Sequence, residues 1–96
     1  MATASVRFEI GEHEWLSERN GMLFLGHTAL GVVEFLITSE ALVELLNPDL
    51  DSIDSDTAIE TFIEFEAHIH RIAQREFVSR LGGEPPILLT AADVSA

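Results

Sequence analysis

The segment EFEAHIHRIAQRE, residues 64 to 76, concentrates carboxylate, imidazole and guanidinium groups in a short stretch of chain. Such groups act as metal ligands or as general acids and bases. His68 and His70 would share a face on a β-strand, but on an α-helix they lie about 200° apart. Apolar residues recur around them with helical spacing, which excludes a His-x-His metal site: Phe62, Phe65, Ile69, Ile72 and Ala73.

Glu66 and His70 are four residues apart, so a helix makes them neighbours at the margin of this apolar stripe. One interpretation is a proton-transfer pair or a small site for a metal or another ligand. The other is a structural pair beside the core. His27, on a predicted strand, is a candidate third member, whereas His13 lies between two glutamates and is expected to be solvated. Because the spacing fixes no third ligand and no nucleophile, we predict no catalytic residue, no bound metal and no cofactor.

Charges on the outer side of the same predicted helix are segregated. Asp56, Glu60 and Glu64 come first and Arg71 and Arg75 follow, which suits the helix dipole. It also suits self-association, because two such helices laid antiparallel would place acids against arginines at both ends. The pattern therefore predicts a candidate interaction face and a possible homodimer.

Composition narrows the function classes. The 96 residues include 17 acids and five bases, all arginine, for a formal net charge of −12. Such a chain repels phosphate backbones, so we expect no direct nucleic-acid binding, although a basic protein partner is possible. The sequence has no cysteine, no long apolar run and no basic-apolar leader, so we expect a cytoplasmic protein without a membrane segment.

Hydrophobic patterning predicts the elements that position these residues. VRFEI alternates as a half-buried strand, and MLFLGHT and VVEFLI are two further strands with a turn at Gly31. The polar segment 11–21 between the first two strands is expected to be a connection anchored by Trp15 and Leu16. ILLT, residues 87–90, predicts a last strand, and AADVSA a tail.

Two helices are expected between the third and last strands. TSEALVELLNP predicts a short one, capped by Thr38 or Ser39 and stopped at Asn47-Pro48. A long amphipathic helix is expected from Thr57, where Thr57 and Glu60 fit a capping box, to about Leu81, with Gly82-Gly83 ending it.

These elements predict a single α+β domain over residues 1–96, with an ordered core at about 5–91. In it a small antiparallel β-sheet, in the order strand, strand, strand, helix, helix, strand, carries the short helix and the long amphipathic helix on one face.

The order and content of these segments match a known pattern over residues 6 to 94. Its parts are VRFEI, Trp15, MLFL, GVVEFLI, SEAL, the helix AIETFIEFEAHIHRIAQREF and ILLTAADV. In this pattern the chain resembles a family of short bacterial proteins called domain of unknown function number fourteen eighty-eight. The resemblance implies an antiparallel sheet backed by helices. It implies no activity and transfers no site residue.

Three functions are consistent with the sequence. The first is a non-enzymatic protein-interaction or self-associating module. The second is an acidic DNA mimic that inhibits a basic nucleic-acid-binding protein, suggested by the acid density between Glu34 and Glu66. The third is a small metal or ligand binder that uses Glu66 and His70. We expect the first.

Overall fold

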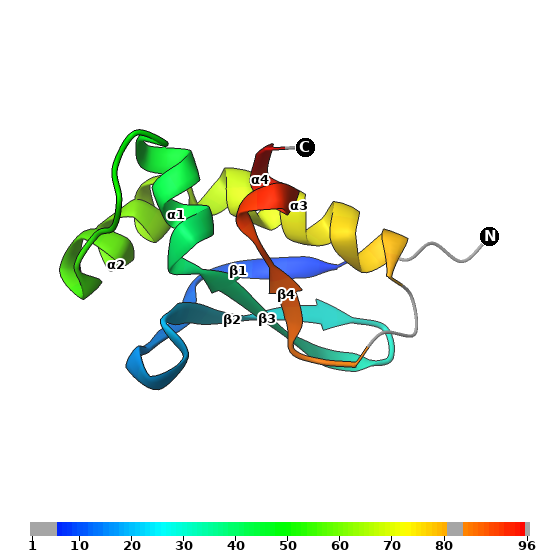
Figure 1. The fold of residues 1–96 in the computed structure, drawn as a ribbon. Helices are drawn as coiled ribbons and strands as arrows, with labels where there is room; N and C mark the ends of the chain where they lie inside the picture. Colours follow the sequence, from blue (N-terminus) through cyan, green and yellow to red (C-terminus); the bar gives the residue numbers. More distant parts are fainter. Residues whose placement is uncertain (1–5, 81–83, 96) are drawn as a thin grey trace.

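A computed structural model of the chain describes residues 6–80 and 84–95 and arranges them in two layers (Figure 1). One layer is a four-stranded sheet in the order β1-β2-β3-β4. The other layer is formed by the α-helices, which lie on one face of the sheet. The predicted α+β class is confirmed. Among the described residues, no α-helix covers the opposite face of the sheet, which we call the outer face.

The central hairpin forms where alternation predicted it. Strand β2 spans Gly21–Thr28 and β3 spans Gly31–Thr38, paired antiparallel. Gly31 has φ 126°, a backbone conformation that side chains with a Cβ rarely adopt, so glycine suits this turn. Phe24 pairs with Phe35 across the two strands, and both side chains face the helices and are buried.

Strand β1, Arg7–Leu16, is longer than predicted, and the expected connection at 11–21 is wrong for its first half. Residues 11–16 continue the strand, and a one-turn 3₁₀ helix, η1 (Ser17–Arg19), joins it to β2. The strand also contains a bulge. Between the pairs Phe8–Gly26 and His13–Phe24, β1 holds residues 9–12 where β2 holds only Leu25.

The fourth strand corrects the predicted antiparallel sheet. Strand β4, Ile87–Leu89, pairs parallel with β3, so the sheet is mixed. The chain leaves β3, passes through the helical layer and returns beside it, and a crossover of this kind brings the second strand back in the same direction. The predicted order of strands and helices holds up to this strand except that the long helix is divided in two, and the predicted pairing direction of the strand is wrong.

Helix α1, Ser39–Leu46, forms as predicted. The side chain of Thr38 accepts a hydrogen bond from the backbone N–H of Ala41 at 3.2 Å, which satisfies one of the free donors at the helix start. The helix ends at Asn47, before Pro48.

The single long helix predicted from Thr57 is in fact two helices. Helix α2 spans Ser55–Glu64, helix α3 spans Glu66–Ser79, and Phe65 between them has φ −103° and ψ 17°. The N-cap is Asp54, whose side chain accepts from the backbone N–H of Thr57 at 2.7 Å, so the predicted capping box is wrong.

One hydrogen bond in α2 is consistent with a bend before the break. The Thr61 hydroxyl donates to the Thr57 carbonyl, and hydroxyl bonds of this type often bend helices. The predicted end at Leu81 and Gly82-Gly83 lies outside the described residues.

The predicted tail also carries structure. Helix α4 spans Ala91–Ser95 and is fixed by Arg80, whose guanidinium lies 2.9 Å from an Asp93 carboxylate oxygen. Burial raises the pKa of the Asp93 carboxyl, but hydrogen bonds from Thr90 and Arg80 outweigh it and hold that pKa below its ordinary value. The last strand thus ends in a short helix that contacts α1 and α3.

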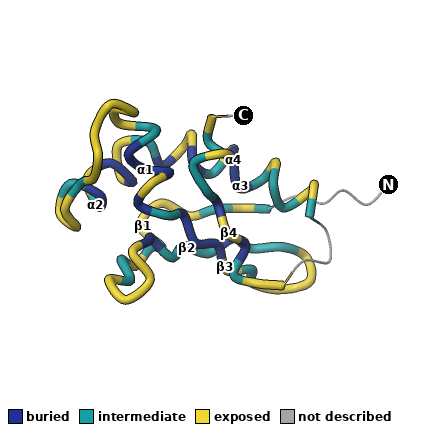
Figure 2. Tube along the Cα trace, in the orientation of Figure 1, coloured by how far each residue is buried: buried dark blue, intermediate teal, exposed yellow. Residues whose placement is uncertain are grey.

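The core lies between the two layers, where buried positions gather on the inner sheet face and on the helices that cover it (Figure 2). Phe24 has ring contacts with both Phe35 and Phe62, with centroids 5.3 Å apart in each pair. Gly26 leaves room for these rings, because a Cβ there would lie 2.8 Å from a Phe35 ring carbon and 2.3 Å from Val6.

Helix α3 also provides two side-chain acceptors to the backbone at and just before β1. The Gln74 side chain accepts a hydrogen bond from the Val6 backbone N–H at 2.7 Å, and a Glu66 oxygen accepts from Gly11 N–H at 3.3 Å. Two side chains of one helix therefore satisfy backbone donors near the edge of the sheet.

Candidate functional site

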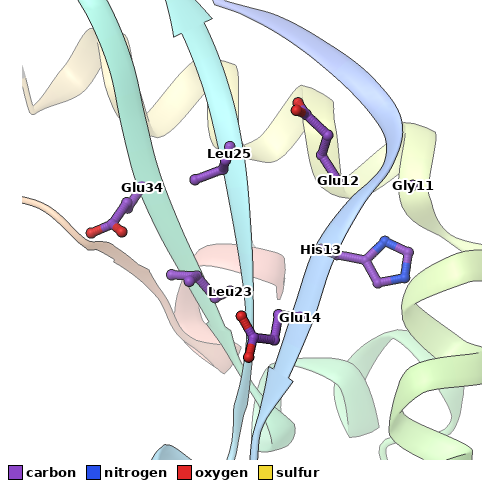
Figure 3. A pocket seen from close by; sticks show the side chains of 7 residues that line it. All are labelled: Gly11, Glu12, His13, Glu14, Leu23, Leu25 and Glu34. Carbon is purple, nitrogen blue, oxygen red and sulfur yellow. The ribbon is translucent and has the colours of Figure 1, made fainter.

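The outer face of the sheet holds a shallow hollow whose lining is apolar at its centre and acidic at its sides (Figure 3). Figure 3 shows the side chains of Leu23 and Leu25 on this face, with carboxylates on either side. The lining comes from three neighbouring strands: Gly11, Glu12, His13, Glu14, Leu23, Leu25 and Glu34.

Strand register explains why these side chains meet. Glu14 pairs with Leu23, Leu23 with Leu36, and Leu36 with Leu88, so one row crosses the whole sheet. Leu88 is 42% exposed, whereas Leu36 is only 2% exposed. The outer face is therefore apolar along this row, and one end of the row is a carboxylate.

The acids lie on both sides of β2. Leu25 pairs with Glu34 on β3, and Glu12 and Glu14 extend from β1 on the other side. Glu12 reaches the outer face from the bulge, where its carboxylate lies 2.7 Å from the Nε2 atom of His27. The β2 leucines therefore lie between carboxylates that come from two different strands.

On the inner face, Glu66 lies between two histidines. Its Oε2 atom is 3.7 Å from His70 Nε2 and 3.9 Å from His13 Nδ1, and its side chain is only 6% exposed. His70 stacks on Phe8, with ring centroids 4.4 Å apart and planes 9° from parallel. The predicted Glu66–His70 neighbourhood is present, but His13, expected to be solvated, completes it.

These distances favour a structural role for the cluster. Both separations exceed the hydrogen-bonding range, and His13 Nδ1 is buried without a hydrogen-bond partner. Burial lowers the pKa of His70 below its ordinary value, the Glu66 carboxylate partly raises it, and His13 lowers it further. Glu66 thus attracts two imidazoles that direct hydrogen bonds do not join to it.

The structure gives the metal interpretation no ligand set. Among residues 6–80 and 84–95, no group of three or more His, Cys, Asp or Glu side chains is arranged to hold a metal ion. His27, the predicted third member, pairs with Glu12 and lies on the outer face, because His27 and Leu25 alternate onto the same side of β2. The grouping of His27 with Glu66 and His70 is wrong.

The predicted charged face is divided between two helices. Asp56, Glu60 and Glu64 are exposed on α2, and Arg71 and Arg75 are exposed on α3, beyond the break at Phe65. The arginines line a second, more open hollow together with His68 and Ile72. The guanidinium group of Arg75 also donates hydrogen bonds to the carboxylate of Glu76 and to the backbone carbonyl of Asp93.

Sequence reasoning did not find the outer-face hollow. A usable signal was present, because MLFL is apolar at every position and therefore offers hydrophobic side chains to both faces of its strand. A second signal was Glu34, which is the one charged residue in VVEFLI on the neighbouring strand. The histidine and carboxylate residues of the predicted helix indicated a site on the inner face instead.

Comparison with known proteins supports the fold. No protein-family model matches the chain, and no curated protein matches its sequence. A solved structure does match, with a TM-score of 0.70 and 16% sequence identity, over 93% of this chain and 96% of the other. It is a crystal structure of a protein of unknown function from the DUF1488 family of Shewanella loihica PV-4.

None of the helices in the described part of the chain is both long enough and apolar enough to cross a membrane. The matched structure covers nearly the whole chain, as the sequence pattern predicted. The resemblance predicted from the sequence is therefore confirmed by the structural match, and the chain has the fold of a bacterial DUF1488 protein.

Proposed function

We propose that this protein is a non-enzymatic protein-interaction module that binds its partner on the outer face of the sheet. The observation that carries the proposal is the uncovered hollow at Leu23 and Leu25, with exposed Leu88 on the same face. Apolar side chains gathered on one exposed surface are typical of binding surfaces. The inner face is already covered by helices.

The test compares two leucine double variants. Leu23→Ser with Leu25→Ser changes the hollow, whereas Leu46→Ser with Leu50→Ser changes exposed leucines at the end of α1 and in the loop after it. Each variant and the wild type are immobilised and used to capture proteins from a lysate of the native host. The captured partner is then purified, and its affinity is measured by calorimetry.

We expect the outer-face double variant to bind the partner at least about tenfold more weakly than the wild type does. The control double variant should bind it with the affinity of the wild type. Equal affinity for all three proteins would refute the proposal. If the purified partner binds nucleic acid and duplex DNA competes with the module for it, the DNA-mimic prediction gains support.

Self-association through the helical layer is a second candidate. Its support is the exposure of Asp56, Glu60 and Glu64 on α2 together with Arg71 and Arg75 on α3. Because this contact would be electrostatic, we expect a dimer at low salt that dissociates at high salt, as measured by light scattering. Arg71→Glu alone should weaken the dimer, and a monomer at every salt concentration would exclude it.

A further inference from the structure

The outer face has a charge pattern that identifies the kind of partner it fits. We infer that it binds a short basic amphipathic helix of another protein, laid along β2 with its apolar stripe on Leu23 and Leu25 and its basic residues on both flanks. This inference rests on the proposed function, because it specifies the occupant of the same surface.

Spacing on the two sides agrees. Leu23 and Leu25 are two residues apart on one strand, which separates them by about 6.8 Å along the strand. Residues four apart on an α-helix are separated by about 6 Å along its axis and lie on one face. A helix with apolar residues at positions i, i+4 and i+7 can therefore match the β2 leucines along its length.

Charge selects the flanking residues of that helix. Glu12 and Glu14 rise from β1 and Glu34 rises from β3, so carboxylates lie on either side of the leucines (Figure 3). Lysine or arginine on both borders of an apolar stripe would meet them. Glu12 already has His27 beside it at 2.7 Å, so Glu14 and Glu34 are expected to contribute most.

Charge also decides against a second copy of this chain on the same surface. Two outer faces stacked on each other would bring Glu12, Glu14 and Glu34 of both copies together, in a protein whose net charge is −12. The basic residues at the far end of this face, Arg7 and His27, each have a glutamate beside them. A basic partner removes this repulsion, whereas a second copy increases it.

Two synthetic peptides test the partner chemistry directly. Both have about 14 residues and the same leucines at positions i, i+4 and i+7 of a helix, with lysine and arginine at the flanks of one and glutamate at the flanks of the other. Binding to the full chain is measured by calorimetry. Backbone amide NMR shifts locate the contact, and those of β2 and β3 should change most.

Two triple variants with the same change in net charge separate a local effect from a general one. The test variant is Glu12→Gln, Glu14→Gln and Glu34→Gln on the outer face. The control is Glu40→Gln, Asp49→Asn and Asp51→Asn, all exposed and on α1 or in the loop after it. We expect the test variant to bind the basic peptide about tenfold more weakly and the control to change less than about twofold.

Three results would overturn the inference. Equal weakening by both triple variants would mean that net charge alone attracts the peptide. Shifts confined to residues of the helical layer would place the contact elsewhere. Binding of the acidic peptide as tightly as the basic one, or of neither peptide, would remove the basic helix as the occupant. The proposed function would then still be decided by the leucine double variants and the purified partner.

Discussion

The two faces of one sheet differ in how their apolar residues are covered. On the inner face, Phe24 and Phe35 are 1% and 0% exposed and have contacts with rings from α2, α3 and β1. On the outer face, Leu23 and Leu25 from the same strand are only partly covered, and carboxylates stand beside them. The inner face holds the fold together, whereas the outer face has hydrophobic side chains that the fold itself leaves partly exposed.

The largest effect is expected from truncating the inner face. Phe24→Ala removes a 1% exposed ring that packs against Phe8, Phe35 and Phe62, and should lower the free energy of unfolding by about 3–5 kcal/mol. Urea denaturation followed by circular dichroism measures this. A loss below about 1 kcal/mol would mean that the two faces do not differ as described.

A smaller effect is expected from adding one carbon to the inner face. In Gly26→Ala the new methyl group would lie 2.3 Å from Val6 and 2.8 Å from the Phe35 ring, so overpacking should cost about 1–3 kcal/mol. The double change Val6→Ala with Gly26→Ala should recover part of that loss in the same denaturation experiment. Without any recovery, the Val6 contact would not be the cause.

A fall in pH should lower the free energy of unfolding through His70 on the inner face. Because its pKa is lowered in the folded protein, the unfolded chain binds a proton more readily, and the free energy of unfolding falls as pH drops below about 6.5. Glu66 and His13 both act on the pKa of His70, the carboxylate raising it and the second imidazole lowering it. The melting temperature of His70→Gln should therefore depend less on pH between about 7.5 and 5 than that of the wild type.

His68→Gln, on the exposed side of the same helix, is the matched control. It should keep the pH dependence of the wild type. If the two variants behave alike, His70 is not the group responsible.

The smallest effect on stability is expected on the outer face. Leu25→Ser changes a half-buried side chain with no helix above it and should cost less than about 1 kcal/mol in urea denaturation. Its effect on binding the basic peptide should be much larger than its effect on stability. A stability loss as large as that of Phe24→Ala would show that Leu25 belongs to the core.

Local patterns predicted the parts of this structure that depend on neighbouring residues. Strands β2 and β3, the turn at Gly31 and the Thr38 cap of α1 follow from alternation, backbone freedom and capping chemistry. The break at Phe65 did not, because no glycine or proline marks it. The parallel pairing of β4 depends on where the helical layer returns the chain, which no local pattern encodes.

The third member of the Glu66 cluster was predicted wrongly for a similar reason. If the residues of β1 are counted by twos from Phe8, Ile10 should lie on the inner face of the sheet and His13 on the outer face. The bulge at residues 9–12 shifts that parity, so Ile10 is 75% exposed and His13 points toward Phe62. His13 therefore took the place beside Glu66 that was predicted for His27. Where a strand is interrupted by extra residues, the face of each side chain beyond the interruption cannot be counted from its start.

The attachment of α3 to the edge of β1 has a consequence for the protein in concentrated solution. A strand edge with unpaired backbone donors can recruit a strand from another molecule and begin a fibril. Gln74 and Glu66 occupy two such donors, at Val6 and Gly11. The same helix that covers the hydrophobic core thus also blocks two positions at which a strand from another molecule could pair.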